Sequence, residues 1–147
     1  MSLKGKIEKD LTEAQKTKEE TKVSTLRMLN AALKNEEIKK KGDLDEAQVI
    51  EIIAREAKKR REAIESYKAG GRGELAEKEE RELKVLTKYL PEQLSHDKIK
   101  EAVEEAIKKT GAKGPSDFGK VMGVVMGKLK GRADGAEVQG LVKERLG

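Results

Sequence analysis

Apolar residues recur along most of this 147-residue chain at spacings of three and four, which is the period of one helix face. Runs that alternate apolar and polar residues, as half-buried strands do, are absent from the sequence. The pattern therefore predicts an all-α fold. The predicted helices cover about residues 3–16, 22–41, 46–69, 74–90, 96–110, 117–130 and 135–146.

Turn signals lie between these helices. Either Asp43 or Asp45 can cap the third helix, and Gly42 fits a left-handed residue at the end of the second. The glycine-rich stretch 70–73 lies between two helices without a preceding strand, so we interpret it as a turn and not as a phosphate loop. These signals predict helices joined by short connections.

The segment from Tyr89 to Ser95 is the best candidate for a domain boundary. Pro91 disfavours helix at the residue before it, and Ser95 is a good N-cap for the next helix. We expect a helical domain of about four helices over residues 1–94, followed by a three-helix tail domain over residues 95–147.

Three glycines, Gly119, Gly123 and Gly127, lie at four-residue spacing inside the sixth helix, and Gly131 ends it. At 100° per residue the three form a stripe about 80° wide, and each costs helix stability about 1 kcal/mol relative to alanine. Two interpretations fit such a bare backbone face. Either the fifth or the last helix crosses it at short range, which we favour, or it forms part of a surface that binds another molecule.

Four cations accompany the glycines: Lys120, Lys128, Lys130 and Arg132. Ammonium and guanidinium groups beside open backbone suit phosphates, which carry most of the affinity of proteins for nucleic acids. Cations at the end of a helix also interact favourably with its dipole, which is the simpler explanation for three of them. In the first domain, Arg60 falls on the apolar side of its helix and can pair with a carboxylate there.

The charge balance permits nucleic-acid binding without demanding it. The formal net charge is +5, but Lys and Arg are interleaved with Asp and Glu along nearly the whole chain, as on solvated helix faces. Aromatic residues make up only 2%, so stacking platforms for unpaired bases are lacking. RNA binding by this chain is therefore expected to read shape and backbone.

The sequence offers no catalytic site. It has no cysteine and one histidine, His96, which excludes Cys- or His-based nucleophilic triads and metal clusters. We expect no catalytic residues, no metal and no cofactor. The N-terminus lacks an apolar signal core and no apolar run reaches membrane-spanning length, so we expect a cytoplasmic protein that does not enter a membrane.

Four blocks of the sequence carry a family resemblance, and together they cover nearly the full length. They are Ser24–Ile38, Ala57–Tyr67, Glu82–Ser95 and Asp117–Leu146. In this order they resemble the YqeY-like proteins of the GatB/YqeY family. The last block also resembles the C-terminal tail domain of the B subunit of the glutamine-dependent aminoacyl-tRNA amidotransferase.

The resemblance implies an N-terminal helical domain and a three-helix tail. In the amidotransferase the tail helps to hold the tRNA, and amide transfer occurs in a domain that this chain does not contain. It thus implies a non-catalytic accessory protein whose partners are tRNA, an aminoacyl-tRNA amidotransferase or a synthetase. The family label, carbon–nitrogen ligase with glutamine as amido donor, then belongs to the larger enzyme. The alternative is a protein–protein interaction module that uses the glycine-striped helix. The tail motif falls here on Gly119, Lys120, Met122, Gly123, Met126, Lys130, Gly131, Arg132, Ala133 and Asp134.

Overall fold

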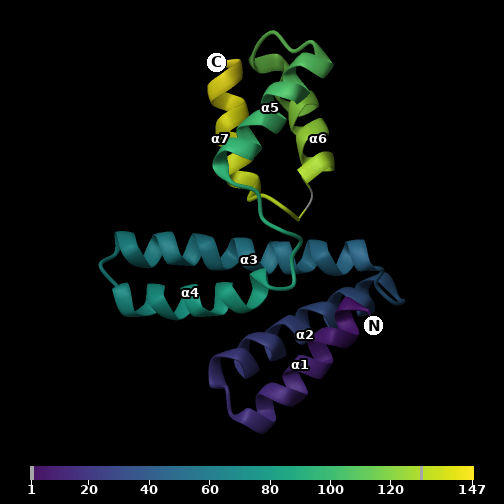
Figure 1. Cartoon of the computed structure of the whole chain (residues 1–147), viewed down its shortest axis with the longest axis vertical. Helices are drawn as coiled ribbons and strands as arrows, with labels where there is room; N and C mark the ends of the chain where they lie inside the picture. The colour runs from purple at the N-terminus through teal and green to yellow at the C-terminus, as the bar shows by residue number, and fades with distance from the viewer. Residues whose placement is uncertain (1, 130) are drawn as a thin grey trace. The chain divides into compact units, whose positions relative to one another are not determined.

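A computed structural model describes residues 2–129 and 131–147 (Figure 1). These residues form seven α-helices and one 3₁₀ turn with no strand among them, which confirms the all-α prediction. The chain divides into two compact units, the first ending at Leu90 and the second beginning at Pro91. The elements are α1 (Leu3–Thr17), α2 (Glu20–Lys40), α3 (Glu46–Ala69), α4 (Gly73–Thr87), α5 (His96–Thr110), η1 (Pro115–Asp117), α6 (Phe118–Leu129) and α7 (Gly135–Leu146).

The first unit is built from two helical hairpins, α1 with α2 and α3 with α4, whose partners lie side by side (Figure 1). Its core forms where the apolar stripes of the helices meet. The Tyr89 hydroxyl, just after α4, donates a hydrogen bond to Asp10 Oδ2 of α1 at 2.6 Å and so joins the two hairpins. The buried core residues are Ile7, Leu26, Leu29, Leu33, Val49, Ile52, Ile53, Leu86 and Tyr89.

Local capping explains where α2 ends and α3 begins. Asp45 is the N-cap of α3 and forms a capping box with Gln48, which decides between the two predicted caps. The prediction of a left-handed Gly42 is wrong, because Lys41 takes that conformation with φ 60°. Gly42 follows one position later, and its N–H donates to the Glu37 carbonyl at 3.2 Å, as in a Schellman-type ending.

An ion-pair cluster around the buried Glu82 joins α3 to α4. Arg60 Nε of α3 lies 3.1 Å from Glu82 Oε2 and 3.5 Å from Glu79 Oε2, and Glu82 is only 5% exposed. The prediction that Arg60 pairs with a carboxylate is confirmed. Since a buried charge without its partner is strongly unfavourable, the three side chains hold the α3–α4 register as a unit.

The second unit packs α5, α6 and α7 around one core (Figure 1). The chain that enters it is fixed to the turn after α6, because Leu94 N–H donates to the Arg132 carbonyl at 2.8 Å and Gln93 Nε2 to the Gly131 carbonyl at 2.7 Å. Gly131 has φ 74°, a left-handed conformation that favours glycine. The buried core residues are Ile99, Ala102, Val103, Ala106, Val121, Val125, Leu129, Val138, Leu141 and Val142.

Candidate nucleic-acid interface

Helix α6 has two opposite faces. Val121, Val125 and Leu129 are buried, at 3% exposure or less. Each glycine of the stripe is two residues from one or two of these side chains, and a step of two places it about 160° away around the helix. The glycines therefore lie on the side of α6 that faces away from the core of the second unit.

The glycine stripe is open to solvent. Gly119, Gly123 and Gly127 are all exposed, and a Cβ built on any of them meets no atom of the described residues within 4 Å apart from the adjacent residues and the backbone of α6 itself. The favoured expectation that α5 or α7 crosses α6 at these positions is wrong, because the core residues turn the stripe outward. The sequence already indicated this orientation, because each glycine lies two residues from a valine and therefore on the opposite side of the helix. Close approach by another molecule stays a prediction.

A groove of about 460 Å³ runs between α5 and α6 beside the stripe. Glycine, alanine and valine make up most of its lining, and Glu105, Lys109 and Lys128 add charged groups to it. Ala102 and Ala106 are both buried, at 6% exposure or less. The surface left open by the glycines of α6 thus continues across the groove to α5. Its lining residues are Ala102, Glu105, Ala106, Lys109, Gly123, Val124, Val125, Gly127 and Lys128.

Two of the four predicted phosphate-binding cations lie at this surface. Lys120 is exposed and makes no ion pair with any described residue, and it lies about 20° around the helix from Gly127. Lys128 Nζ lies 2.6 Å from Glu105 Oε2 of α5, and this hydrogen bond lowers the pKa of the Glu105 carboxyl. Both partners of that pair are more than half exposed, so solvent competes for it.

The other two predicted cations differ. Arg132 is half-buried and its Nε lies 3.4 Å from the Glu92 carbonyl, so it takes part in closing the second unit. Lys130 lies outside the described residues. The structure adds one cation that sequence reasoning missed, Lys109, which lines the groove from the last turn of α5. Its position follows only from the packing of α5 on α6.

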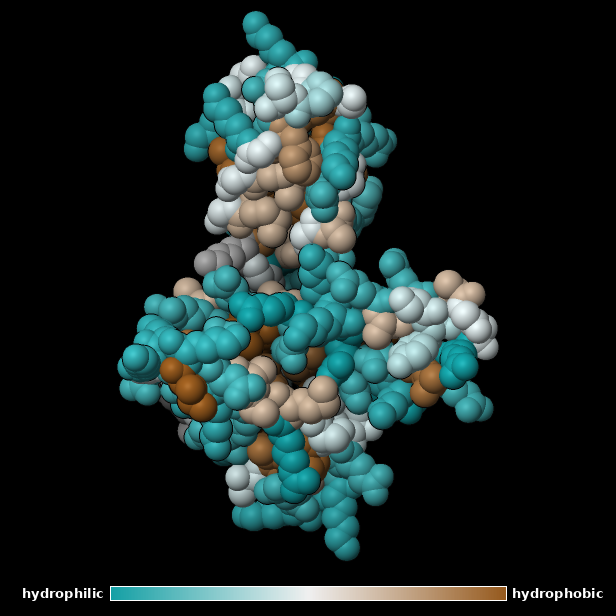
Figure 2. Space-filling model, turned by 180° about the vertical axis from the view of Figure 1, so that it is seen from behind, coloured by the Kyte–Doolittle hydropathy of each residue, from teal (hydrophilic) through white to brown (hydrophobic). Residues whose placement is uncertain are grey.

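Figure 2 shows one face of the molecule, on which a pale to brown surface of the second unit is bordered by teal, hydrophilic side chains. Partly buried apolar residues pack against the core of this unit, among them Phe118, Met122 and Met126 of α6. The second unit thus presents apolar and charged surface side by side.

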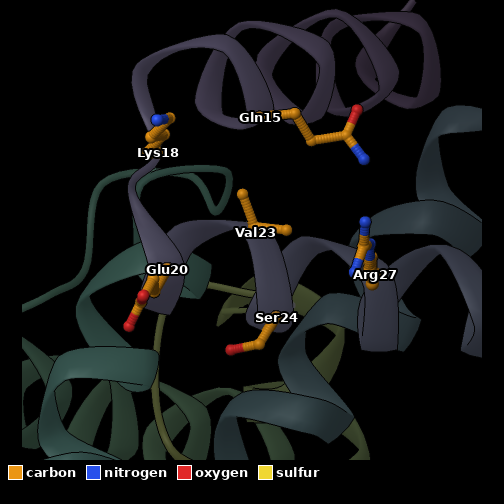
Figure 3. Close-up of a pocket in the computed structure, with 6 residues that line it drawn as sticks. All are labelled: Gln15, Lys18, Glu20, Val23, Ser24 and Arg27. Atoms are coloured by element: carbon orange, nitrogen blue, oxygen red, sulfur yellow. The ribbon is translucent and has the colours of Figure 1, made fainter.

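A second hollow, of about 460 Å³, lies in the first unit between the end of α1 and the start of α2 (Figure 3). Gln15 and Arg27 face each other across it, while Glu20 points away. It is open and of mixed charge, and it gathers no set of groups suited to acid–base or nucleophilic chemistry. Its lining residues are Gln15, Lys18, Glu20, Val23, Ser24 and Arg27.

The described residues contain no group of three or more His, Asp or Glu placed to hold a metal ion. His96 is exposed at the start of α5, and its Nδ1 lies 2.8 Å from Glu137 Oε1 of α7. Among residues 2–129 and 131–147, no helix is both long and apolar enough to cross a membrane.

The fold defines an all-helical, two-unit protein with an open glycine face on its second unit. The family model described as Yqey-like protein matches residues 4–146, and the chain belongs to this family.

Curated relatives match part of the chain. "Altered inheritance of mitochondria protein 41, mitochondrial" is 36% identical in Candida glabrata over 90 residues, 60% of this chain and 50% of the relative. The protein of the same name in Lachancea thermotolerans is 33% identical over 85 residues, 57% and 46% of the two chains. An uncharacterised protein of Schizosaccharomyces pombe is 30% identical over 95 residues, 65% and 77% of the two chains. The chain spans about half the length of the first two relatives.

The cytoplasmic expectation is corrected by this comparison. Several of the similar proteins carry the word mitochondrial in their names. The sequence argument rested on what the N-terminus lacks, and such an absence does not identify a compartment.

Proposed function

We propose that this protein is a non-catalytic RNA-binding module that holds the backbone of a folded RNA, such as tRNA, on the glycine face of α6. The observation that carries the proposal is the exposure of Gly119, Gly123 and Gly127. Glycines inside a helix lower its stability, and no neighbouring helix in the second unit uses these. A binding partner that must approach the backbone of α6 closely would explain why these positions are glycine.

The chemistry of the neighbouring side chains supports phosphate as the group that approaches. Lys120 is unpaired among the described residues, and Lys109 and Lys128 border the groove. The distance from Gly119 to Gly127 along the helix is about 12 Å. That length matches about three phosphates of one duplex strand. The glycine face of α6 thus suits a short stretch of RNA backbone. Contacts to phosphates do not require aromatic side chains, which are rare in this chain.

Glu105 has a defined part in this scheme. Its carboxylate neutralises Lys128 in the free protein and repels phosphate at the groove. RNA must replace Glu105 as the partner of Lys128, which lowers affinity and favours backbones that also engage Lys120.

The test is the binding of a fluorescent tRNA transcript to the full chain across a series of salt concentrations. We expect affinity to fall with salt, and the slope of log K against log salt to shrink by about two in Lys120→Ala/Lys128→Ala. The control is Lys78→Ala/Lys84→Ala, which removes the same charge from the exposed face of α4. No binding at low salt, or equal losses in the two variants, would falsify the proposal.

A second candidate is docking of a partner protein on the same face, such as an aminoacyl-tRNA amidotransferase. The apolar floor of the groove, with Ala102, Ala106 and Val124, favours it. Here Gly123→Leu would abolish binding of the purified amidotransferase while Lys120→Ala/Lys128→Ala changed it little. Loss of tRNA binding in both variants would favour RNA, because the proposed backbone contact needs the bare glycine face as well as the lysines.

A further inference from the structure

Helix α2 carries a second, partly apolar face that no other helix of the described first unit covers. Its inner face buries Leu26, Leu29 and Leu33. On the outer side, residues spaced four, three, four and three apart are all exposed, and among them Met28 is 45% and Ile38 73% exposed. We call this row the outer α2 seam: Ser24, Met28, Ala31, Asn35 and Ile38.

The spacing of the outer α2 seam is that of a coiled-coil contact line, in which apolar positions alternate at intervals of three and four. The seam extends about 21 Å, or four helical turns. Ala31 at its centre allows a second helix to approach closely, and the larger Met28 and Ile38 lie on either side of it. This geometry fits another helix laid along α2.

A groove of about 400 Å³ between α2 and α3 lies along one side of the seam. Met28, Ala31, Ala32 and Ile52 contribute its apolar lining. Met28 is held in place, because Arg60 Nη2 lies 3.4 Å from its sulfur and Arg60 is itself fixed by Glu82. The seam is therefore one wall of a preformed groove.

Cations flank the seam on both sides. Arg27 and Lys34 lie on one side, are exposed, and make no ion pair with any described residue. On the groove side lie Lys39, Arg55 and Lys59. These three cations form ion pairs with two carboxylates: Glu36 pairs with both Lys39 and Arg55, and Glu56 pairs with Lys59. The borders of the seam are thus positive in excess.

We propose that the outer α2 seam is a docking surface for an acidic amphipathic helix of a partner protein. Apolar residues on that helix would contact Met28, Ala31 and Ile38, and its carboxylates would pair with the flanking cations. This inference goes beyond the proposed RNA binding and concerns the other unit.

The charges argue against other occupants. In an antiparallel pair of α2 helices, Arg27 of one copy would face Lys34 of the other, and a parallel pair would set Lys34 against Lys39. Both arrangements oppose like charges, so a second copy fits poorly. Nucleic acid would match the cations but leaves the apolar seam without a contact.

The experiment uses the full chain with ¹³C-labelled methionine methyl groups, because Met28 lies in the seam and Met122 and Met126 lie in the second unit. The probe is a designed four-turn peptide with Leu at its seam positions and Glu beside them. A reference peptide carries Lys in place of Glu. We expect the Glu peptide to shift the Met28 methyl signal alone, with a Kd of about 10–100 µM at low salt, as for weak docking interactions.

Two variants make the test specific to the seam. Lys34→Glu and Ile38→Asp change exposed side chains and should each weaken the Glu peptide about tenfold. The matched control Lys84→Glu, on α4, should leave its affinity unchanged.

Four results would overturn the proposal: no Met28 shift at about 1 mM peptide, equal binding of the Lys peptide, equal binding by Lys34→Glu, or a Met28 shift that depends on protein concentration alone. The last would assign the seam to a second copy. A Met28 shift caused by duplex RNA or by vesicles of anionic phospholipid, with none caused by the Glu peptide, would also refute it.

Discussion

Replacing the exposed glycines of α6 with alanine should stabilise the protein. In Gly123→Ala/Gly127→Ala each added Cβ enters open space, since no atom of the described residues lies within 4 Å of it apart from the adjacent residues and the backbone of α6 itself. Both residues lie inside α6 and neither has a positive φ, so alanine adopts the same conformation without strain. The substitution then acts mainly by restricting the unfolded chain.

The magnitude follows from the known difference between glycine and alanine in helices. Each substitution is expected to add about 0.5–1 kcal/mol to the free energy of unfolding of the second unit, and the pair about 1–2 kcal/mol. For a unit the size of residues 91–147, a change of 1 kcal/mol moves the melting temperature by about 4–8 °C. The double variant should therefore melt at least several degrees higher.

The assay is thermal and urea unfolding of the full chain, followed by circular dichroism. Gly111→Ala is the matched control, because Gly111 ends α5 with φ 68°, where alanine is strained. It should lower stability by about 1 kcal/mol. Loss of stability in Gly123→Ala/Gly127→Ala would contradict the open position of these glycines, since it would mean that another part of the protein packs on the stripe.

Three further changes test individual contacts. Glu82→Ala should lower the stability of the first unit by about 3 kcal/mol in urea unfolding, because it removes the nearer of the two carboxylates that pair with the partly buried Arg60 and leaves Glu79. An effect below about 1 kcal/mol would show that the pair with Glu82 contributes little to stability. Burial, with the hydrogen bond to Asp10, raises the pKa of Tyr89, so the folded state binds the phenolic proton more tightly than the unfolded state. This stabilisation is complete below about pH 10 and is lost as the pH rises further; Tyr89→Phe should lose less stability than the wild type between about pH 9.5 and 11, and parallel curves would contradict the assignment. Glu105→Gln should raise tRNA affinity in the binding assay, because Lys128 then no longer has to leave a carboxylate in order to bind phosphate; unchanged affinity would show that Lys128 is already free in the unbound protein.

Local patterns in the sequence predicted the helices well. Periodicity placed all seven, and Ser95 caps α5 as expected. The apolar side of α3 also identified Arg60 as a partly buried cation that pairs with a carboxylate. Each of these features depends on residues of one helix only, because helical periodicity and capping involve residues a few positions apart in the sequence.

Contacts between helices were harder to foresee. The pairing of Tyr89 with Asp10 and that of Lys128 with Glu105 join residues far apart in the sequence. Periodicity tells which face of a helix is buried but not which helix covers it. The glycine stripe was misjudged for a different reason: its composition suggested helix packing, although its offset from the valines pointed outward.

We propose above that the open face of α6 receives an incoming RNA backbone. This proposal is tested most directly by titrating a labelled tRNA with wild type, Gly123→Ala/Gly127→Ala and Gly123→Leu/Gly127→Leu in one buffer, beside their unfolding curves. The alanine variant should be more stable yet bind tRNA more weakly, and the leucine variant should remain folded and lose tRNA binding. Equal tRNA affinity in all three folded proteins would contradict it.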